Sequence, residues 1–316
     1  AMAFALTDRK KPVKLVWSRE DDLMGGYYRP AFAHKVRVGL DQKGNIVAWD
    51  HRIAGKPIFK GTPLEKILVK DGIDGTSVEG VNDTHYDIPG LFVGLTDHKT
   101  PVPVVWWRSV GHSHTAFVME TMIDEAAKAA ARDPLEFRLG LLPGKDDDQK
   151  RLAGVLKLVA EKAGWKIAPP AGRSRGIAVH KSFNSYVAQV VEVSRDGDAY
   201  KVENVTCAVD CGIAVNPDII KAQMESGIGY GLGHVMRNEI TLDEGKVQQQ
   251  NFPDYEPLRI GDIANIDVHI QRSDKAPTGV GEPGLPPSGP ALANAIAANG
   301  PRVTHLPLIS NGVEFV

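Results

Sequence analysis

Two apolar segments, Tyr186–Val193 (YVAQVVEV) and Tyr200–Val209 (YKVENVTCAV), lie on either side of Arg195–Asp198 (RDGD). Both segments are rich in valine, whose branched side chain favours strands, and Asp-Gly is a common turn sequence. The stretch therefore predicts an antiparallel β-hairpin.

The same alternation around turn residues predicts two more hairpins. Between residues 55 and 91, Gly, Pro and Asp are frequent, which predicts mainly ordered loop with a short helix at Leu64–Leu68. The two hairpins are His34–Leu40 with Ile46–Ile53 around Asp41–Gly44, and Glu239–Leu242 with Lys246–Gln249 around Asp243–Gly245.

Four longer helices are predicted from apolar residues at a helical period and from end signals. Since the strands come in hairpins and the helices do not alternate with them one by one, the fold class is α+β, with mixed hairpin-rich sheets and packed helices. The first helix carries Val118, Met122, Ile123, Ala126, Ala127 and Ala130 and stops at Asp133-Pro134; the second carries Leu152, Val155, Leu156 and Val159 and stops at Gly164; the third begins at Asn216-Pro217; the last runs from Ser288 to Ala298 and ends at Gly300.

The composition is that of a globular protein. The chain has 316 residues, 42% hydrophobic, with a formal net charge of −2. A near-neutral chain argues against a nucleic-acid partner, which needs a basic surface. No apolar run is long enough for a membrane span, and the first residues carry no secretion signal. The sequence leaves the compartment open between the periplasm and the cytoplasm of a bacterium.

The chain contains two cysteines, Cys207 and Cys211. Two thiols are too few for an iron–sulfur cluster held by four thiolates, and no histidine pair completes a zinc site. Both are expected to be structural thiols.

Glu282 lies in a loop of glycines and prolines, Thr278–Pro287 (TGVGEPGLPP). Glycines let the backbone approach a ligand closely and prolines fix the turn, so the carboxylate is held rigidly, as a general base requires. The alternative is a solvent-exposed glutamate in an ordinary turn.

A second segment, Gln223–Gly233 (QMESGIGYGLG), has four alternating glycines within what are expected to be the first turns of a helix. Each glycine costs a helix about 1 kcal/mol relative to alanine. Close approach of a flat ligand would explain them, and so would close packing against another backbone.

A third segment, Trp106–His114 (WWRSVGHSH), places aromatic residues and Arg108 at the entry to a helix. Free backbone N–H groups at a helix N-terminus suit an anionic ligand. Arg108 as a plain surface cation is the alternative. His112 and His114 suggest a metal pair, but no third ligand follows at a usual spacing.

Together and in this order, the segments resemble the molybdenum-binding subunit of the xanthine dehydrogenase family, and the match covers nearly the whole chain. Trp106–His112 (WWRSVGH) and Val13–Asp22 (VKLVWSREDD) are similar to its isoquinoline 1-oxidoreductase and membrane-associated aldehyde dehydrogenase branch. The family's motifs correspond as follows: Phe-Arg-Gly to Trp107–Gly111, Asp-x-Gly to Asp210–Gly212, Asn-Pro to Asn216-Pro217, Gln-x-Glu-Gly to Gln223–Gly227, and Gly-x-Gly-Glu-Pro to Gly279–Pro283.

The resemblance implies a hydroxylase that oxidises an aldehyde or an N-heteroaromatic substrate with water-derived oxygen. Glu282 would be the catalytic base, activating a molybdenum-bound hydroxyl group. The expected cofactor is molybdopterin with molybdenum, in its cytosine dinucleotide form, with no protein side chain bound directly to the metal. Val110 would line the substrate pocket, and the residues that hold the cofactor would be Trp107, Arg108, Gln223 and Gly281.

Three positions depart from the family pattern. Ser109 stands in place of a glycine, and Ser226 in place of another. Val110 stands where a phenylalanine is usual, and its smaller side chain is expected to widen the substrate cleft. The resemblance also divides the chain at a boundary, with residues 1–105 as the end of the first molybdopterin-binding domain and residues 106–316 as the second.

Two glycine-rich segments of this branch, Gly-Gln-Gly and Gly-Gly-x-Phe-Gly, are expected upstream of Val13 and are not found there. The chain therefore looks like one part of a split, cleaved or truncated subunit. The expected partners are a chain carrying the N-terminal part of the molybdenum subunit and an iron–sulfur subunit with 2Fe–2S clusters. The rival hypothesis is a non-catalytic scaffold or interaction domain that keeps the fold without the cofactor.

Overall fold

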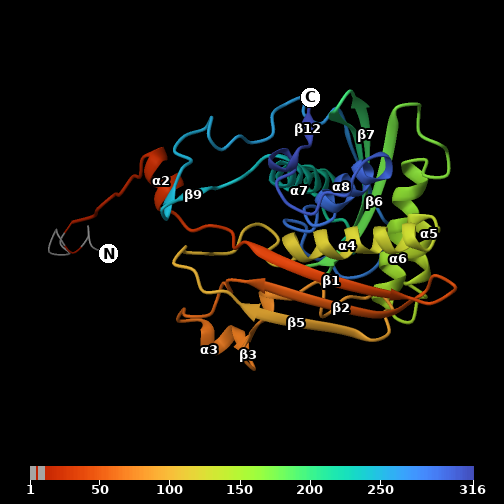
Figure 1. Cartoon of the computed structure of the whole chain (residues 1–316), viewed down its shortest axis with the longest axis horizontal. Helices are drawn as coiled ribbons and strands as arrows, with labels where there is room; N and C mark the ends of the chain where they lie inside the picture. The colour runs from red at the N-terminus through yellow and green to blue at the C-terminus, as the bar shows by residue number, and fades with distance from the viewer. Residues whose placement is uncertain (1–4, 6–10) are drawn as a thin grey trace.

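A computed structural model describes residue 5 and residues 11–316 of the chain. Residues 1–4 and 6–10 of the expected first domain therefore lie outside the described part. Two main β-sheets are present, and helix α4 (His112–Ala129) lies between one of them and helix α8 (Ser288–Asn299) (Figure 1). The α+β class predicted from the sequence is confirmed.

The first sheet has three strands, in the order β1 (Phe32–Leu40), β2 (Ile46–Gly55) and β5 (Leu91–Asp97). The predicted hairpin is confirmed, because β1 and β2 pair antiparallel around Asp41–Gly44. The third strand, β5, pairs parallel to β2. No turn sequence marks a parallel pair, and the sequence did not predict this strand.

The second sheet has the order β11 (Ile266–Ile270), β8 (Ala199–Asp210), β7 (Ser185–Asp196) and β6 (Arg173–Ser182), and β12 (Glu314–Phe315) pairs with the start of β8. The predicted hairpin is the pair β7–β8, with its turn narrowed to Gly197 and Asp198. Strands β6 and β11 were not predicted, and β11 runs parallel to β8.

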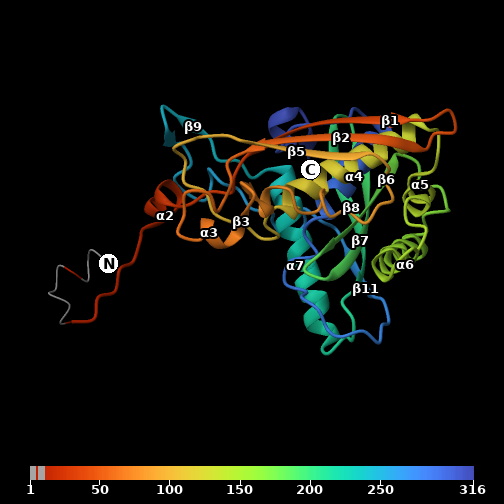
Figure 2. The ribbon, with the colours of Figure 1, turned by 90° about the horizontal axis from the view of Figure 1, so that it is seen from below.

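Both faces of the second sheet are buried, which explains why β7 and β8 are apolar almost throughout. Val187 and Val191 face one core, while Ala188 and Val190 face the other. The first core is closed by α7 (Pro217–Met236) and α8, and the second by α5 (Pro134–Gly140) and α6 (Asp147–Lys162). Figure 2 shows α6 and α7 on opposite sides of β7 and β8.

Three predicted helices match the structure closely. In α6 the predicted apolar face is buried, and Gly164 follows the helix at φ +61°. Helix α8 begins at Ser288 as predicted, and the Asn216 side chain caps α7 by accepting a hydrogen bond from the Ile219 N–H.

Helix α4 is buried on two sides, since Phe117 faces the second sheet and Ile123 faces the first. Helix α4 ends at Ala129, before Asp133-Pro134, as predicted, but a further helix, α5, follows it directly. Asp133 caps α5, and Pro134 is its first residue, where a missing N–H costs nothing.

The four glycines of Gln223–Gly233 do not lie in the first turns of a helix, and that prediction is wrong. Because α7 starts at Pro217, they lie in its second half. A Cβ at Gly231 would lie 2.0 Å from Ser288 Oγ, and one at Gly227 would lie 3.0 Å from the Gly284 carbonyl carbon. These two glycines let α7 pack directly against the loop that follows Glu282.

The remaining elements are short. The predicted hairpin at 239–249 reduces to two strands of two residues each. Among the helices of the described residues, none is both long and apolar enough to span a membrane. The short elements are α2 (Arg19–Gly25), α3 (Glu65–Leu68), β3 (Val69–Lys70), β4 (Ile73–Asp74), β9 (Leu242–Asp243), β10 (Lys246–Val247) and two 3-10 turns, Gly75–Ser77 and Ile309–Asn311.

Candidate functional site

The turn before α4 has an unusual backbone conformation. Ser109 has φ +71° and Val110 has φ +47°, in the left-handed region that non-glycine residues rarely adopt. The turn is held by Glu282, because the Ser109 N–H donates to Glu282 Oε1 at 2.9 Å and the Ser109 hydroxyl donates to the Glu282 carbonyl at 2.8 Å. The left-handed conformation accounts for the glycine that the family pattern has at position 109.

Arg108 connects this turn to the two other predicted segments. Its Nε donates to the Gly281 carbonyl at 2.7 Å, and its Nη2 donates to Gln223 Oε1 at 3.2 Å. Its Nη1 donates to Ser226 Oγ at 2.8 Å. The structure thus brings Arg108, Gln223, Gly281 and Glu282 together, although 59 positions separate Gln223 from Glu282.

The Arg108 guanidinium is half-buried and binds neutral oxygen atoms. Within the described ranges, no carboxylate oxygen lies within 4.0 Å of it. Burial lowers the pKa of Arg108, an effect that the nearby Tyr230 and Glu282 oppose. The guanidinium also lies over the exposed Tyr230 ring, with Cζ 5.5 Å from its centre. Its positive charge is therefore available to an anionic group.

The side chains of Trp107 and Val110 have neighbours outside the Glu282 loop. The centre of the Trp107 ring lies 5.0 Å from the centre of the His234 ring and 6.5 Å from that of the Tyr230 ring, both on α7. Val110 lines a small cavity together with Trp107 and His114. The two residues are joined to the Glu282 site through the backbone of the turn.

Two contributors to the site were missed. Ser226 was noted as a departure from the family pattern, but its bond to Arg108 was not predicted. Glu79 accepts a hydrogen bond from the Gly111 N–H at 2.7 Å and so supports the same turn. Burial raises the pKa of Glu79 to about 7. Nothing in the loop sequence around Glu79 distinguishes it from other surface acids.

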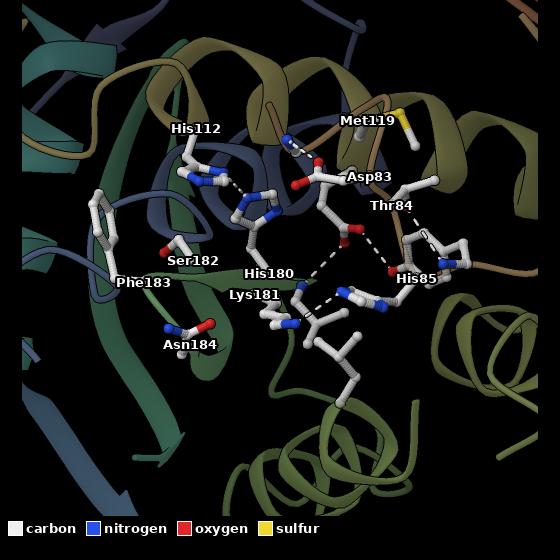
Figure 3. A pocket seen from close by; sticks show the side chains of 15 residues that line it. Asp83, Thr84, His85, His112, Met119, His180, Lys181, Ser182, Phe183 and Asn184 are labelled. Carbon is white, nitrogen blue, oxygen red and sulfur yellow. Dashed lines mark hydrogen bonds between the residues drawn. The ribbon is translucent and has the colours of Figure 1, made fainter. Parts of the chain in front are cut away.

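The suggested metal pair His112 and His114 is not brought to one point. His112 Nδ1 lies 2.8 Å from His180 Nε2, whereas His114 Nδ1 lies 3.0 Å from His34 Nε2. His112 and His180 line a cavity of about 180 Å³ next to the site (Figure 3). Phe183 lies at the edge of this cavity and packs against Gly279. The centre of its ring lies 5.7 Å from the centre of the His112 ring.

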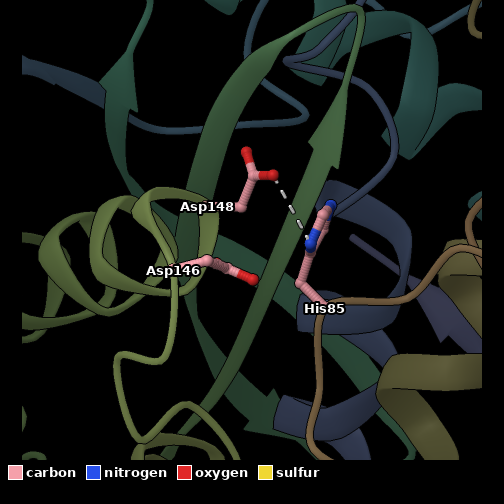
Figure 4. A group of neighbouring side chains, drawn as sticks. All are labelled: His85, Asp146 and Asp148. Atoms are coloured by element: carbon pink, nitrogen blue, oxygen red, sulfur yellow. Dashed lines mark ion pairs between the residues drawn. The ribbon is translucent and has the colours of Figure 1, made fainter.

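His85, which also lines that cavity, forms a cluster with metal-ligand chemistry together with Asp146 and Asp148 at the start of α6 (Figure 4). The polar atoms of this cluster already have protein partners. Lys181 Nζ lies 2.8 Å from Asp148 Oδ1 and 3.1 Å from His85 Nε2, and Asp146 caps α6. The ammonium group occupies the place of a cation, and we assign no metal here.

Two family models, both described as a molybdopterin cofactor-binding domain, match the chain at residues 1–140 and 119–264. The chain belongs to the family of molybdopterin cofactor-binding proteins. The resemblance to the molybdenum-binding subunit, predicted from the three motifs, is confirmed.

Two relatives show the branch. The chain is 33% identical to the isoquinoline 1-oxidoreductase subunit beta of Brevundimonas diminuta over 94% of its own length and 38% of the relative. It is 32% identical to the membrane-bound aldehyde dehydrogenase of Gluconacetobacter polyoxogenes over 94% of its own length and 42% of the relative. The chain thus spans about two fifths of the length of these relatives.

Solved structures share the fold. Quinoline 2-oxidoreductase from Pseudomonas putida 86 matches with a TM-score of 0.77 at 12% identity, covering 98% of this chain and 65% of that one. The aldehyde oxidoreductase of Desulfovibrio gigas matches with a TM-score of 0.72 at 13% identity, covering 92% and 49%.

Proposed function

We propose that the chain is part of a molybdenum hydroxylase that oxidises an aldehyde or an N-heteroaromatic compound with water-derived oxygen, and that Glu282 is its base. One observation carries the proposal. Arg108 joins Gln223 to Gly281, and Ser109 holds the adjacent Glu282, so residues from three distant segments form one constellation.

The position of Glu282 supports its role. A general base must be fixed relative to the proton that it removes. Ser109 holds both the carboxylate and the backbone of Glu282, and Pro283 restricts the next residue. Among the described residues, only Oε1 of the carboxylate is hydrogen-bonded, which leaves Oε2 to accept a proton.

The surroundings of Arg108 fit an anionic cofactor. We propose molybdopterin in its cytosine dinucleotide form, whose phosphates would meet the Arg108 charge. A Cβ at Gly281 would meet no atom within 4 Å, so this backbone is open to close approach. Because Arg108 binds Gln223 Oε1, the amide nitrogen of Gln223 is left to donate to the cofactor. When bound, the cofactor supplies a metal centre that accepts two electrons from the substrate.

The turn before α4 would contribute to both the cofactor site and the substrate pocket. We propose that Trp107 contributes to the cofactor site through its backbone, since its ring packs against α7. Val110 is proposed to form a wall of the substrate pocket. The boundary between residues 1–105 and 106–316 is proposed as the division between the two cofactor-binding domains.

Electron transfer requires more than this chain. Cys207 on β8 and Cys211 directly after that strand are both buried free thiols, so neither is placed to bind a cluster. We propose that 2Fe–2S clusters lie on an iron–sulfur partner, and that further polypeptide, equivalent to the rest of the relatives' length, completes the cofactor pocket. Exposed apolar side chains just before α7 and in its first turn, Ile213, Val215 and Ile219, offer a surface for it to cover.

The test is to purify the protein from its native host with any accompanying chains and to measure molybdenum and cytosine nucleotide content. Stoichiometric molybdenum in a complex that oxidises benzaldehyde or isoquinoline supports the proposal. A metal-free complex without activity would indicate the scaffold role instead. Residues 1–316 expressed alone are expected to be inactive, and full activity of that chain alone would remove the requirement for a partner.

A further inference from the structure

Arg29 is a half-buried cation without a carboxylate partner. Its Nε and Nη2 each donate to Ser113 Oγ at 3.1 Å, and its Cζ lies 5.6 Å from the centre of the Trp107 ring. Throughout residues 11–316, no carboxylate oxygen lies within 4.0 Å of the guanidinium. Burial lowers the pKa of Arg29 to about 10, so the group stays charged at neutral pH. A partly buried cation that lacks a carboxylate partner is stabilised by a bound anion.

A chain of hydrogen-bonded rings ends beside Arg29. Trp49 Nε1 lies 3.4 Å from His51 Nδ1, and His51 Nε2 lies 2.8 Å from His34 Nδ1. His34 Nε2 lies in turn 3.0 Å from His114 Nδ1. This series of hydrogen-bonded rings therefore starts at Trp49 on β2 and ends at His114 on α4.

The order of this chain determines which nitrogen of each ring carries the proton. The indole N–H of Trp49 can only donate, and a neutral imidazole has one donor and one acceptor nitrogen. His51 therefore accepts at Nδ1 and donates from Nε2, and His34 does the same. It follows that His114 accepts at Nδ1 and carries its own proton on Nε2.

Burial keeps these rings neutral. It lowers the pKa of His34 to about 3, of His51 to about 4 and of His114 well below its usual value, and the charge of Arg29 adds to the effect at His34 and His114. His114 thus offers a neutral N–H donor next to the one positive charge of Arg29.

Arg29 and His114 line the same cavity. His114 Nε2 is buried and has no hydrogen-bond partner in the described part of the chain. The cavity that His114 lines with Arg29, Trp107 and Val110 has a volume of about 10 Å³ and no carboxylate among its lining residues. This volume is the space open to the centre of a water-sized particle, so the cavity takes one small ion and no polyatomic oxyanion.

We propose that Arg29 and His114 bind a small monovalent anion of the size of chloride. The guanidinium supplies the charge and the His114 Nε2–H supplies a directed hydrogen bond. The cavity is too small for sulfate or phosphate. The ion would neutralise Arg29 and connect the turn Trp107–Gly111 to β1. This site does not depend on the role of Glu282 or on a bound cofactor.

The direct test is a crystal of the full chain grown in sodium bromide, with anomalous diffraction measured at the bromine edge. The expected result is an anomalous peak within about 3.5 Å of both His114 Nε2 and the Arg29 guanidinium, a hydrogen-bonding separation allowing for the larger ion. A peak is also expected in Arg52→Gln, a matched change on the exposed face of β2, and no peak in Arg29→Gln. Density without an anomalous signal would mean a water molecule and would overturn the proposal.

Binding in solution is measured by thermal unfolding in sodium chloride and in sodium gluconate at equal ionic strength. The wild-type Tm is expected to rise with chloride along a saturating curve, by up to roughly 4 °C at about 100 times Kd. His114→Phe keeps the stacking on Phe32 but removes the N–H. This variant is expected to need at least a tenfold higher chloride concentration for the same rise in Tm. Equal Tm values of the wild type in the two salts would refute the site. A rise of Tm with chloride that is undiminished in both Arg29→Gln and His114→Phe would also refute it.

Discussion

Replacing Gly231 by alanine should destabilise the protein, whereas the same change at Gly229, two positions away on α7, should stabilise it. A Cβ at Gly231 would lie 2.0 Å from Ser288 Oγ and 2.9 Å from the Leu285 carbonyl oxygen, both buried. A Cβ at Gly229 would meet no atom within 4 Å. The two variants therefore differ only in whether the methyl group has room.

The magnitudes follow from two opposing effects. Alanine is favoured over glycine in a helix interior by about 1 kcal/mol, and both variants gain this. At Gly231, overpacking costs up to about 3 kcal/mol, because the Leu285 carbonyl belongs to the backbone and cannot turn aside. The net expectation is a loss of about 2 kcal/mol for Gly231→Ala and a gain of about 1 kcal/mol for Gly229→Ala.

The assay is thermal unfolding followed by circular dichroism, with urea unfolding as a second measure. With about 2.1 cal/mol/K of unfolding entropy per residue over 316 residues, a difference of about 3 kcal/mol separates the two Tm values by roughly 4–5 °C. If Gly231→Ala proved as stable as Gly229→Ala, the close packing of α7 against the loop after Glu282 would be wrong.

Three other changes test separate parts of the account. Ser109→Ala should lower the free energy of unfolding by about 1 kcal/mol, because it removes the hydrogen bond from the Ser109 hydroxyl to Glu282. Ser109→Gly loses the same bond but relieves left-handed strain of about 1–2 kcal/mol. Urea unfolding should therefore find the glycine variant the more stable. The pKa of Glu79 is raised from 4.5 to about 7, so the protonated form is favoured by folding, and its stabilisation is complete below pH 4.5 and lost as pH rises through 7. Between these pH values the free energy of unfolding of the wild type should therefore fall by about 3 kcal/mol relative to that of Glu79→Gln. If the two free energies kept a constant difference across this range, the raised pKa would be contradicted. Arg138→Leu should cost about 3–5 kcal/mol, since it leaves the buried Glu120 carboxylate without its ion pair, and a loss under 1 kcal/mol would show that the pair is dispensable.

The elements predicted correctly from the sequence are those with local signals. The hairpins β1–β2 and β7–β8 follow from alternating residues around turns, and α6, α7 and α8 follow from periodicity and caps. Strands β5 and β11 were missed because each pairs in parallel with a strand far away in the sequence, so no turn marks the pair. Helix α5 was missed because Asp133-Pro134 can end one helix and begin the next.

The candidate site was predictable only in part. The local sequence around Glu282 is equally that of an exposed turn, and the grouping with Arg108 and Gln223 came from the order of motifs in a family. The hydrogen bonds of Arg108, the left-handed Ser109 and the support by Glu79 depend on three-dimensional contacts. The ring chain from Trp49 to His114 draws on three separate elements, and no spacing in the sequence reveals it.

The central claim, that Glu282 is the base of a molybdopterin enzyme, is tested most directly by Glu282→Gln in the complex isolated from the native host. Glutamine keeps the shape and can still accept the Ser109 N–H, but it cannot take up the proton. At unchanged molybdenum content, turnover of benzaldehyde or isoquinoline with an artificial electron acceptor should fall by about two to four orders of magnitude. Near-normal turnover in this variant, with the metal present, would contradict the assignment of Glu282.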